Sequence, residues 1–155
     1  MIRKYYIKTI VGSMKIITNG KCIQSAEIID DKPKKYFKLD DRSIALEEEI
    51  NNYLTGFSIK LTPKYILDGT EFQCKVWRAI SLIPYGQTKT YGEIAKSIGR
   101  PGSFRAVANA CGQNKLVFFI PCHRVVGKNN LGGYKHGWEI KRWLLDLEKN
   151  NSGKT

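Results

Sequence analysis

The chain has 155 residues, of which 42% are hydrophobic, so it can bury a core and is not a globally disordered protein. Its 26 Lys and Arg residues against 14 Asp and Glu give a net charge of +12, which favours a polyanionic partner such as nucleic acid or, equally, a lysine-rich solvated surface. No apolar run reaches the ~18 residues of a membrane helix, and the start MIRKYYIKTIVG lacks the apolar segment of a secretory signal. We therefore expect a cytoplasmic protein, nuclear if eukaryotic, with no membrane partner.

The first thirty residues predict short antiparallel strands. They alternate loosely between apolar and polar residues, and Asn19-Gly20 is typical of a hairpin turn. A charged, proline-containing loop is expected over 30–41. Ser43 is then expected to cap a helix whose apolar face consists of Leu46, Ile50, Tyr53, Leu54 and Phe57. A strand-and-loop connection over 58–69 leads into the second half.

The second half predicts several helices. TEFQ at 70–73 is a capping box that opens a helix with Val76, Trp77 and Ile80 inward. TYGE at 90–93 is a second capping box, and its short helix ends before Gly99. Ser103 is expected to cap the next helix. Two short helices joined by GRPGS resemble a helix-turn-helix, although many helical hairpins with this pattern never contact DNA.

An apolar stretch at 116–120 predicts a buried strand that leads into the segment IPCHRVVG. A glycine-rich loop, GKNNLGGYKHG, follows at 127–137. The last helix is amphipathic, with Ile140, Trp143, Leu144 and Leu147 expected to face inward. The final residues, 151–155, are expected to be a frayed tail.

The four cysteines are widely scattered, lack a C-x-x-C pair and are accompanied by only two histidines, so we expect free thiols and no metal site. Cys122 followed by His123 is the pair that could do chemistry. A free cysteine has a pKa of about 8.5 and needs a base within reach to become a nucleophile. On an extended strand the two side chains point to opposite faces. They can cooperate only through a local turn, which Pro121 favours, or through a bridging water. Otherwise Cys122 is a buried structural cysteine.

IPCHRVVG resembles the active-site signature of the O6-alkylguanine-DNA alkyltransferases. Between Thr70 and Glu148 the chain is similar to that family in six elements, in order: FQCKVWRAI, IPYGQTKTYGEIA, RAVANACGQNKL, IPCHRVVG, GGYKHG and KRWLLDLE. The first 65 residues match only loosely. The resemblance implies an α+β protein, with a small α/β N-terminal domain over 1–66 and a helical, winged-helix-type C-terminal DNA-binding domain over 67–150.

The resemblance also implies roles for the residues around the cysteine. Cys122 is the expected alkyl acceptor, and His123 the base that removes its proton through a bridging water. Glu148 is expected to orient His123, and the Asn114 side chain to brace the active-site turn. Tyr91 is expected to help rotate the nucleotide out of the duplex and to donate a proton to the base.

DNA-binding residues are implied in the same way. Arg105 resembles the arginine that replaces the extruded nucleotide in the base stack, a role that suits a flat guanidinium. Small residues beginning at Ala106 let this helix approach the minor groove closely. Arg100 and Lys128 are expected to contact phosphates.

Three further residues are expected at the substrate pocket. The backbone carbonyls of Cys122 and Val125 would accept the guanine amino group. Tyr134 and Lys135 would line the pocket near the alkylated oxygen.

These expectations combine into a DNA repair protein that transfers an alkyl group from O6-alkylguanine in double-stranded DNA to Cys122. The resulting thioether is not readily reversed, so each molecule should act once. We expect a monomer without a cofactor, since the N-terminal Cys/His set that would bind zinc in relatives is absent. The alternatives are a non-catalytic damage binder that recruits other repair factors, a helix-turn-helix regulator with a structural Cys122, and a Cys-His hydrolase that regenerates its thiol.

Overall fold

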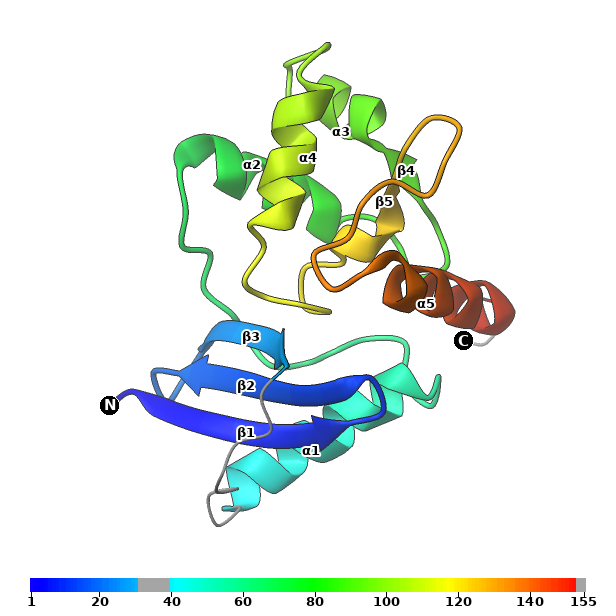
Figure 1. Cartoon of the computed structure of the whole chain (residues 1–155). Coiled ribbons are helices and arrows are strands. Elements are labelled where there is room, and N and C mark those ends of the chain that lie inside the picture. Colours follow the sequence, from blue (N-terminus) through cyan, green and yellow to red (C-terminus); the bar gives the residue numbers. More distant parts are fainter. Residues whose placement is uncertain (31–39, 153–155) are drawn as a thin grey trace. The chain divides into compact units, whose positions relative to one another are not determined.

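The computed structural model describes residues 1–30 and 40–152 and divides the chain into two compact units. The first unit comprises Met1–Ile66 with Lys115–Val117, and the second comprises Leu67–Asn114 with Phe118–Thr155. The described residues form a mixed α+β fold with a three-stranded sheet, a two-stranded sheet and five α-helices (Figure 1). None of these helices is long and apolar enough to cross a membrane.

The predicted N-terminal strands are confirmed. β1 (Arg3–Thr9), β2 (Gly12–Thr18) and β3 (Ile23–Ile29) form an antiparallel sheet in that order. Tyr5 lies opposite Ile16, and Ile7 lies opposite Met14, so alternate residues of two strands bury one shared face. The sheet therefore owes its register to the apolar alternation that the sequence shows.

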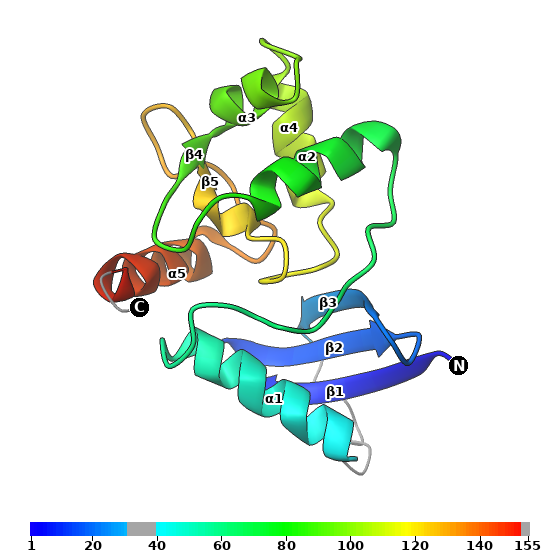
Figure 2. The same ribbon diagram turned by 180° about the vertical axis from the view of Figure 1, so that it is seen from behind.

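α1 (Asp41–Leu54) packs on this sheet (Figure 2). Four of the predicted apolar residues of α1 are buried, namely Leu46, Ile50, Tyr53 and Leu54. The expected cap at Ser43 is wrong, because the Asp40 carboxylate accepts the Ser43 backbone N–H at 2.8 Å and makes Asp40 the N-cap. Phe57 is also wrong as a core residue. It is 89% exposed, since the helix has already ended and the chain turns at Gly56 with φ +81°. The expected loop over 30–41 lies mostly outside the described residues.

The buried strand expected over 116–120 does not form, and only a short bridge takes its place. The Ala26 backbone N–H donates to the Lys115 carbonyl, and the Val117 N–H donates to the Ala26 carbonyl. The chain then turns at Phe118, whose φ of +72° is unusual for a residue with a bulky side chain. Such a conformation costs on the order of 1–3 kcal/mol, and burial of the Phe118 side chain opposes this cost.

Three helices of the second unit pack on one another (Figure 1): α2 (Glu71–Ser81), α3 (Tyr91–Ser97) and α4 (Phe104–Gly112). The capping box at Thr70 and Gln73 forms in full, which confirms the predicted start of α2. Thr90 caps α3 by accepting the Glu93 N–H. Ser103 directly precedes α4, so the predicted start of the helix is confirmed. The expected cap is wrong, because the Ser103 side chain makes no capping hydrogen bond.

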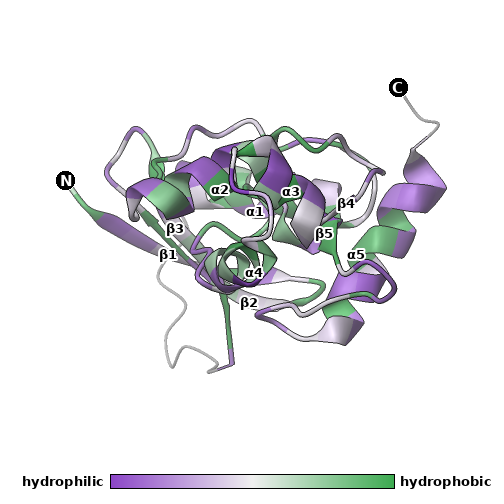
Figure 3. Cartoon of the chain, turned by 90° about the horizontal axis from the view of Figure 1, so that it is seen from above, coloured by the Kyte–Doolittle hydropathy of each residue, from purple (hydrophilic) through white to green (hydrophobic). Residues whose placement is uncertain are grey.

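The rest of the second unit consists of two short strands, one turn of 3₁₀ helix and a final helix. β4 (Lys89–Thr90) pairs in parallel with β5 (Val125–Val126), and the 3₁₀ turn η1 (Cys122–Arg124) directly precedes β5. α5 (Trp138–Asn151) shows alternating hydrophilic and hydrophobic bands (Figure 3).

The inward face predicted for α5 needs correction. Trp143 is 38% exposed, while the buried positions of the helix are Lys141, Leu144, Glu148 and Asn151. Spacings of 3, 4 and 3 place these four on one helical face, so the buried face is largely polar. Asn151 is helical and buried rather than frayed, and residues 153–155 lie outside the described part of the chain.

Candidate active site

Cys122 lies at the start of η1, a tight turn rather than an extended strand. The Arg124 backbone N–H donates to the Pro121 carbonyl at 2.9 Å, which closes the turn after the proline. All three side chains of η1 are buried. The turn expected from Pro121 is therefore present, and the opposite-face geometry of a strand does not apply to Cys122 and His123.

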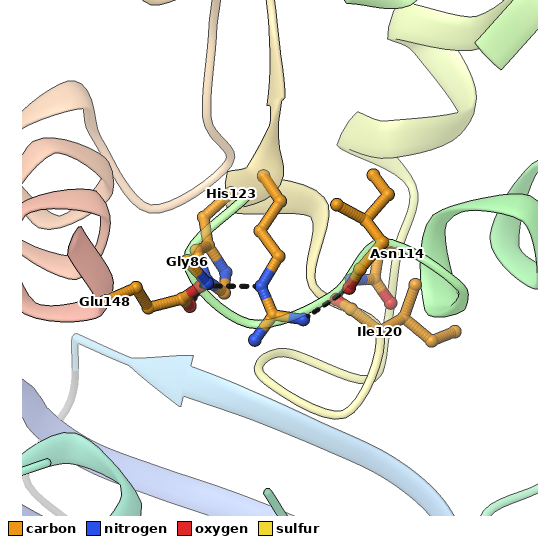
Figure 4. Close-up of polar contacts among 7 residues, drawn as sticks. Gly86, Asn114, Ile120, His123 and Glu148 are labelled. Atoms are coloured by element: carbon orange, nitrogen blue, oxygen red, sulfur yellow. Dashed lines mark hydrogen bonds and ion pairs between the residues drawn. The ribbon is translucent and has the colours of Figure 1, made fainter. Parts of the chain in front are cut away.

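Asn114 holds the segment that leads into this turn. Its side-chain Nδ2 donates to the Ile120 carbonyl at 3.0 Å and to the Cys122 sulfur at 3.3 Å. Figure 4 shows Asn114 beside Ile120. Because Asn114 is itself buried, these two bonds connect the end of α4 to the cysteine through a side chain with little freedom to move.

Glu148, from α5, accepts three donors at its buried carboxylate. His123 Nε2 bonds to Oε2, while Arg124 Nε at 2.7 Å and the Gly86 backbone N–H at 3.0 Å donate to Oε1. Figure 4 shows His123, Glu148 and Gly86 gathered together. Burial alone would raise the pKa of Glu148, but the hydrogen bonds and charges of His123 and Arg124 outweigh it and lower the pKa to about 2. The carboxylate is thus ionised at neutral pH and can only accept.

The protonation state of His123 follows from this contact. Burial lowers its pKa from 6.5, against the opposing effect of Glu148, so the imidazole is neutral at pH 7. Since Glu148 only accepts, the single ring proton must lie on Nε2. Nδ1 then carries a lone pair. It is buried and has no hydrogen-bond partner among the described residues. His123 is therefore a base whose accepting atom is available.

The Cys122 thiol is protonated in this state. Its pKa is raised, first by a hydrogen bond with the Cys111 thiol and then by burial, whereas Asn114 and Lys141 act in the opposite direction. A thiol that holds its proton needs a base to become a nucleophile. His123, adjacent in the same turn, is the histidine positioned for that role.

A cavity of about 370 Å³ opens beside the thiol. Besides Cys122, three of the residues that the sequence places at the site or pocket line it: Tyr91, Tyr134 and Lys135. The full lining consists of these residues with Ala108, Cys111, Gly112, Cys122 and Gly133. Val125 is absent from the lining, and its carbonyl accepts from Lys141 Nζ at 2.6 Å. Burial raises the pKa of Tyr91, so its hydroxyl keeps its proton at neutral pH.

Comparison with known proteins shows the family of this chain. Residues 71–150 match the family model described as 6-O-methylguanine DNA methyltransferase, DNA binding domain. The chain is 45% identical to a probable methylated-DNA–protein-cysteine methyltransferase of Acanthamoeba polyphaga mimivirus, over 94% of this chain and 96% of that protein. It is 39% identical to the methylated-DNA–protein-cysteine methyltransferase of Methanosarcina barkeri, over 95% and 98%. The chain belongs to this methyltransferase family.

The fold of the family is equally close. The crystal structure of Mycobacterium tuberculosis OGT in complex with DNA superposes with a TM-score of 0.85 at 35% identity, and the match covers 96% of this chain and 93% of that one. The alkyltransferase resemblance seen in the sequence is thereby confirmed.

The residues expected at a DNA surface are exposed. Arg105 and Ala106 lie on α4, Arg100 in the turn between α3 and α4, and Lys128 in the loop after β5. The Arg100 guanidinium lies 5.8 Å from the centre of the Phe72 ring. None of these four residues lines the cavity beside Cys122.

Two charged residues of the candidate site are not among those predicted from the sequence. Arg124 is buried against Glu148 and also donates to the Ile83 carbonyl at 2.8 Å. Lys141 is fully buried; its Nζ donates to the Val125 and Gly133 carbonyls, and burial lowers its pKa to about 8. The signal that could have indicated Lys141 is its helical spacing, seven residues before Glu148 and three before Leu144.

Proposed function

We propose that this chain repairs DNA by moving an alkyl group from the O6 atom of guanine to the sulfur of Cys122. The observation that carries the proposal is the arrangement of one turn: a thiol that lines a cavity, beside a neutral histidine whose Nε2 is held by an ionised carboxylate. The relatives are named methylated-DNA–protein-cysteine methyltransferases, and a similar structure was solved with DNA.

In the proposed reaction, His123 Nδ1 takes the Cys122 proton through a bridging water. The thiolate then attacks the alkyl carbon, a carbon–sulfur bond forms, and the bond between that carbon and O6 breaks. The departing guanine takes a proton from the Tyr91 hydroxyl, which burial keeps protonated. The proton held by His123 balances the proton that Tyr91 gives up. Glu148 and Asn114 act as positioning residues for the base and the thiol.

The product is a thioether, which has no leaving group that the site could release again. Each molecule therefore acts once. The proposal also takes the protein to act as a monomer and without a cofactor. This stoichiometry distinguishes the proposal from a Cys-His hydrolase, which would regenerate its thiol. It also distinguishes it from a damage binder, which would leave the alkyl group on the DNA.

The base must leave the duplex to reach a buried thiol, and a damaged base is cheaper to extrude than a normal one. In the proposed complex, α3 and α4 act as a helix-turn-helix of a winged-helix-type domain. Arg105 fills the gap left in the base stack, Ala106 lets α4 approach the minor groove, and Arg100 and Lys128 contact phosphates. The carbonyls of Cys122 and Val125 accept the guanine amino group. Each already accepts one hydrogen bond, and a carbonyl oxygen has room for two.

Intact mass spectrometry after incubation with a duplex that contains one O6-methylguanine tests the proposal. We expect one methyl group per protein molecule, located on Cys122 by peptide mapping, and a matching loss from the DNA. An unmethylated duplex and the Cys122→Ser variant are the controls, and both should give no adduct. An unmodified Cys122 after excess methylated duplex would overturn the proposed function.

A further inference from the structure

A second cysteine lines the cavity of the reactive one. Cys111, in the last turn of α4, and Cys122, at the start of η1, both line it, and the neighbouring Cys111 thiol raises the pKa of Cys122. Both are free thiols; Cys122 is buried and Cys111 is partly exposed. The alkyl transfer described above uses only Cys122, so it leaves the position of Cys111 without an explanation.

We infer that Cys111 and Cys122 form a reversible disulfide on exposure to a peroxide, and that this bond blocks alkyl transfer until a thiol reductant opens it. The inference rests on the proposed function in one respect, namely that Cys122 is the alkyl acceptor. Disulfides inside cells are typically transient and redox-sensing, which matches a pair of free thiols that line one cavity.

The chemistry balances with hydrogen peroxide as the oxidant. His123 accepts the Cys122 proton, and the thiolate attacks one peroxide oxygen, so that the O–O bond breaks and the second oxygen leaves as water. Cys122 is now a sulfenic acid. The Cys111 thiol attacks its sulfur, the S–O bond breaks, and a second water leaves. Two thiols and one peroxide thus give one disulfide and two waters. Two molecules of a small thiol such as glutathione reverse the step by exchange.

The geometry requires only a local adjustment. A disulfide needs its sulfurs about 2.05 Å apart, closer than two free thiols can lie. Cys111 lies in the last turn of its helix and is followed by Gly112, where a side chain would meet no heavy atom within 4 Å. Helix ends open more easily than helix centres. Cys111 is therefore the partner positioned to move toward the rigidly held Cys122.

A reversible disulfide would protect the acceptor thiol, which each molecule can use only once. Without a partner, a sulfenic acid on Cys122 proceeds to sulfinic acid, which is not readily reduced. With Cys111 beside it, the oxidised sulfur is captured in a form that a thiol can restore. The pair would hold the acceptor inactive during oxidative stress and preserve it for later repair.

The test treats the full chain with hydrogen peroxide at low protein concentration, then quenches free thiols with iodoacetamide and maps peptides without reduction. We expect a Cys111–Cys122 linked peptide, a loss of at least ten-fold in methyl transfer, and recovery after dithiothreitol. Peroxide should also abolish methyl transfer by Cys111→Ser, but dithiothreitol should not restore it. The activity of each protein is compared with that of its own untreated sample. Cys22→Ser and Cys74→Ser are matched controls that should behave as the wild type.

Several results would overturn the inference. These are two free thiols after peroxide, a linkage between chains in place of the internal one, a mapped disulfide with undiminished transfer, or full recovery of Cys111→Ser. The proposed function is tested separately, because the untreated protein must methylate Cys122. A protein that forms the mapped disulfide yet transfers no methyl group from DNA would contradict the proposed function and leave the disulfide itself established.

Discussion

In the first unit the described residues bury an apolar core, and its buried polar side chains are those of Thr18 and Ser43. The second unit buries a histidine, an arginine, a lysine and a glutamate, all close to one cysteine: His123, Arg124, Lys141 and Glu148. Burying charge is expensive, and an apolar set of similar volume is often as stable or more stable. The comparison indicates that the first unit is composed for stability, whereas the second retains costly groups beside Cys122, as expected if the proposed reaction uses them.

Removal of the carboxylate at the centre of the charged cluster should have the largest effect. Glu148→Ala leaves Arg124 buried without its counter-ion and His123 without its acceptor. Breaking a buried pair in this way costs about 3–5 kcal/mol, so we expect a loss of that size in the free energy of unfolding and no detectable methyl transfer. Urea denaturation and single-turnover kinetics measure the two effects.

The matched control is an exposed ion pair of the same unit, Glu71 with Lys75. Glu71→Ala should cost less than about 1 kcal/mol and leave transfer unchanged. Equal losses in the free energy of unfolding for Glu148→Ala and Glu71→Ala would show that the buried ion pairs of Glu148 contribute no more to stability than an exposed pair.

The buried charge of Lys141 should make the stability of the second unit depend on pH. Its pKa is about 8 in the folded protein and 10.5 in an exposed lysine, so between these values the unfolded chain binds more protons than the folded one. Stability contributed by this group must then rise with pH from about 8 to 10.5, by roughly 3 kcal/mol at most. The difference in unfolding free energy between the wild type and Lys141→Met, measured by urea denaturation across this range, should show the rise.

A flat difference across that range would mean that the ammonium is as well solvated in the folded protein as in the unfolded chain. The same variant has a second readout. Because Lys141 Nζ holds the Val125 and Gly133 carbonyls, Lys141→Met should slow methyl transfer even at pH 7, where the charge of the wild-type lysine does not change.

The apolar core of the first unit should respond differently. Ile50→Val removes one methylene from a fully buried side chain of α1, which costs about 1 kcal/mol. We expect that loss in the free energy of unfolding and an unchanged rate of methyl transfer per folded molecule. A clear change in rate would contradict the division of roles between the two units.

The elements that the sequence predicts correctly are those specified by neighbours in the chain. The strand alternation and the Thr70 capping box depend on residues two or three positions apart, and both form as expected. The cap at Asp40 is hard to predict because Asp40 lies among other charged residues. The burial of Lys141 is hard to predict because a lysine on an amphipathic helix normally faces water. Only the tertiary structure shows the two carbonyls that accept hydrogen bonds from its ammonium.

The candidate site also has residues that the sequence predicts and contacts that only the tertiary structure shows. The pairing of Cys122 with His123 and the turn at Pro121 are visible in one short segment, and resemblance to a family adds Glu148 and Asn114. The cavity that Cys111 and Cys122 both line joins residues eleven positions apart, across the end of α4 and a turn at Phe118. The φ of +72° at Phe118 has no local signal, since bulky residues rarely adopt it.

Arg105→Ala should have the smallest effect on stability and still separate DNA binding from chemistry. Arg105 is exposed on α4, so its removal should change the free energy of unfolding by less than about 0.5 kcal/mol. If the side chain fills the stack after base flipping, the variant should react much more slowly with O6-methylguanine in a duplex. The free O6-methylguanine base needs no flipping and should react at the wild-type rate. Parallel single-turnover assays on the two substrates measure the ratio, and an equal slowing on both would assign Arg105 to the chemical step rather than to extrusion of the base.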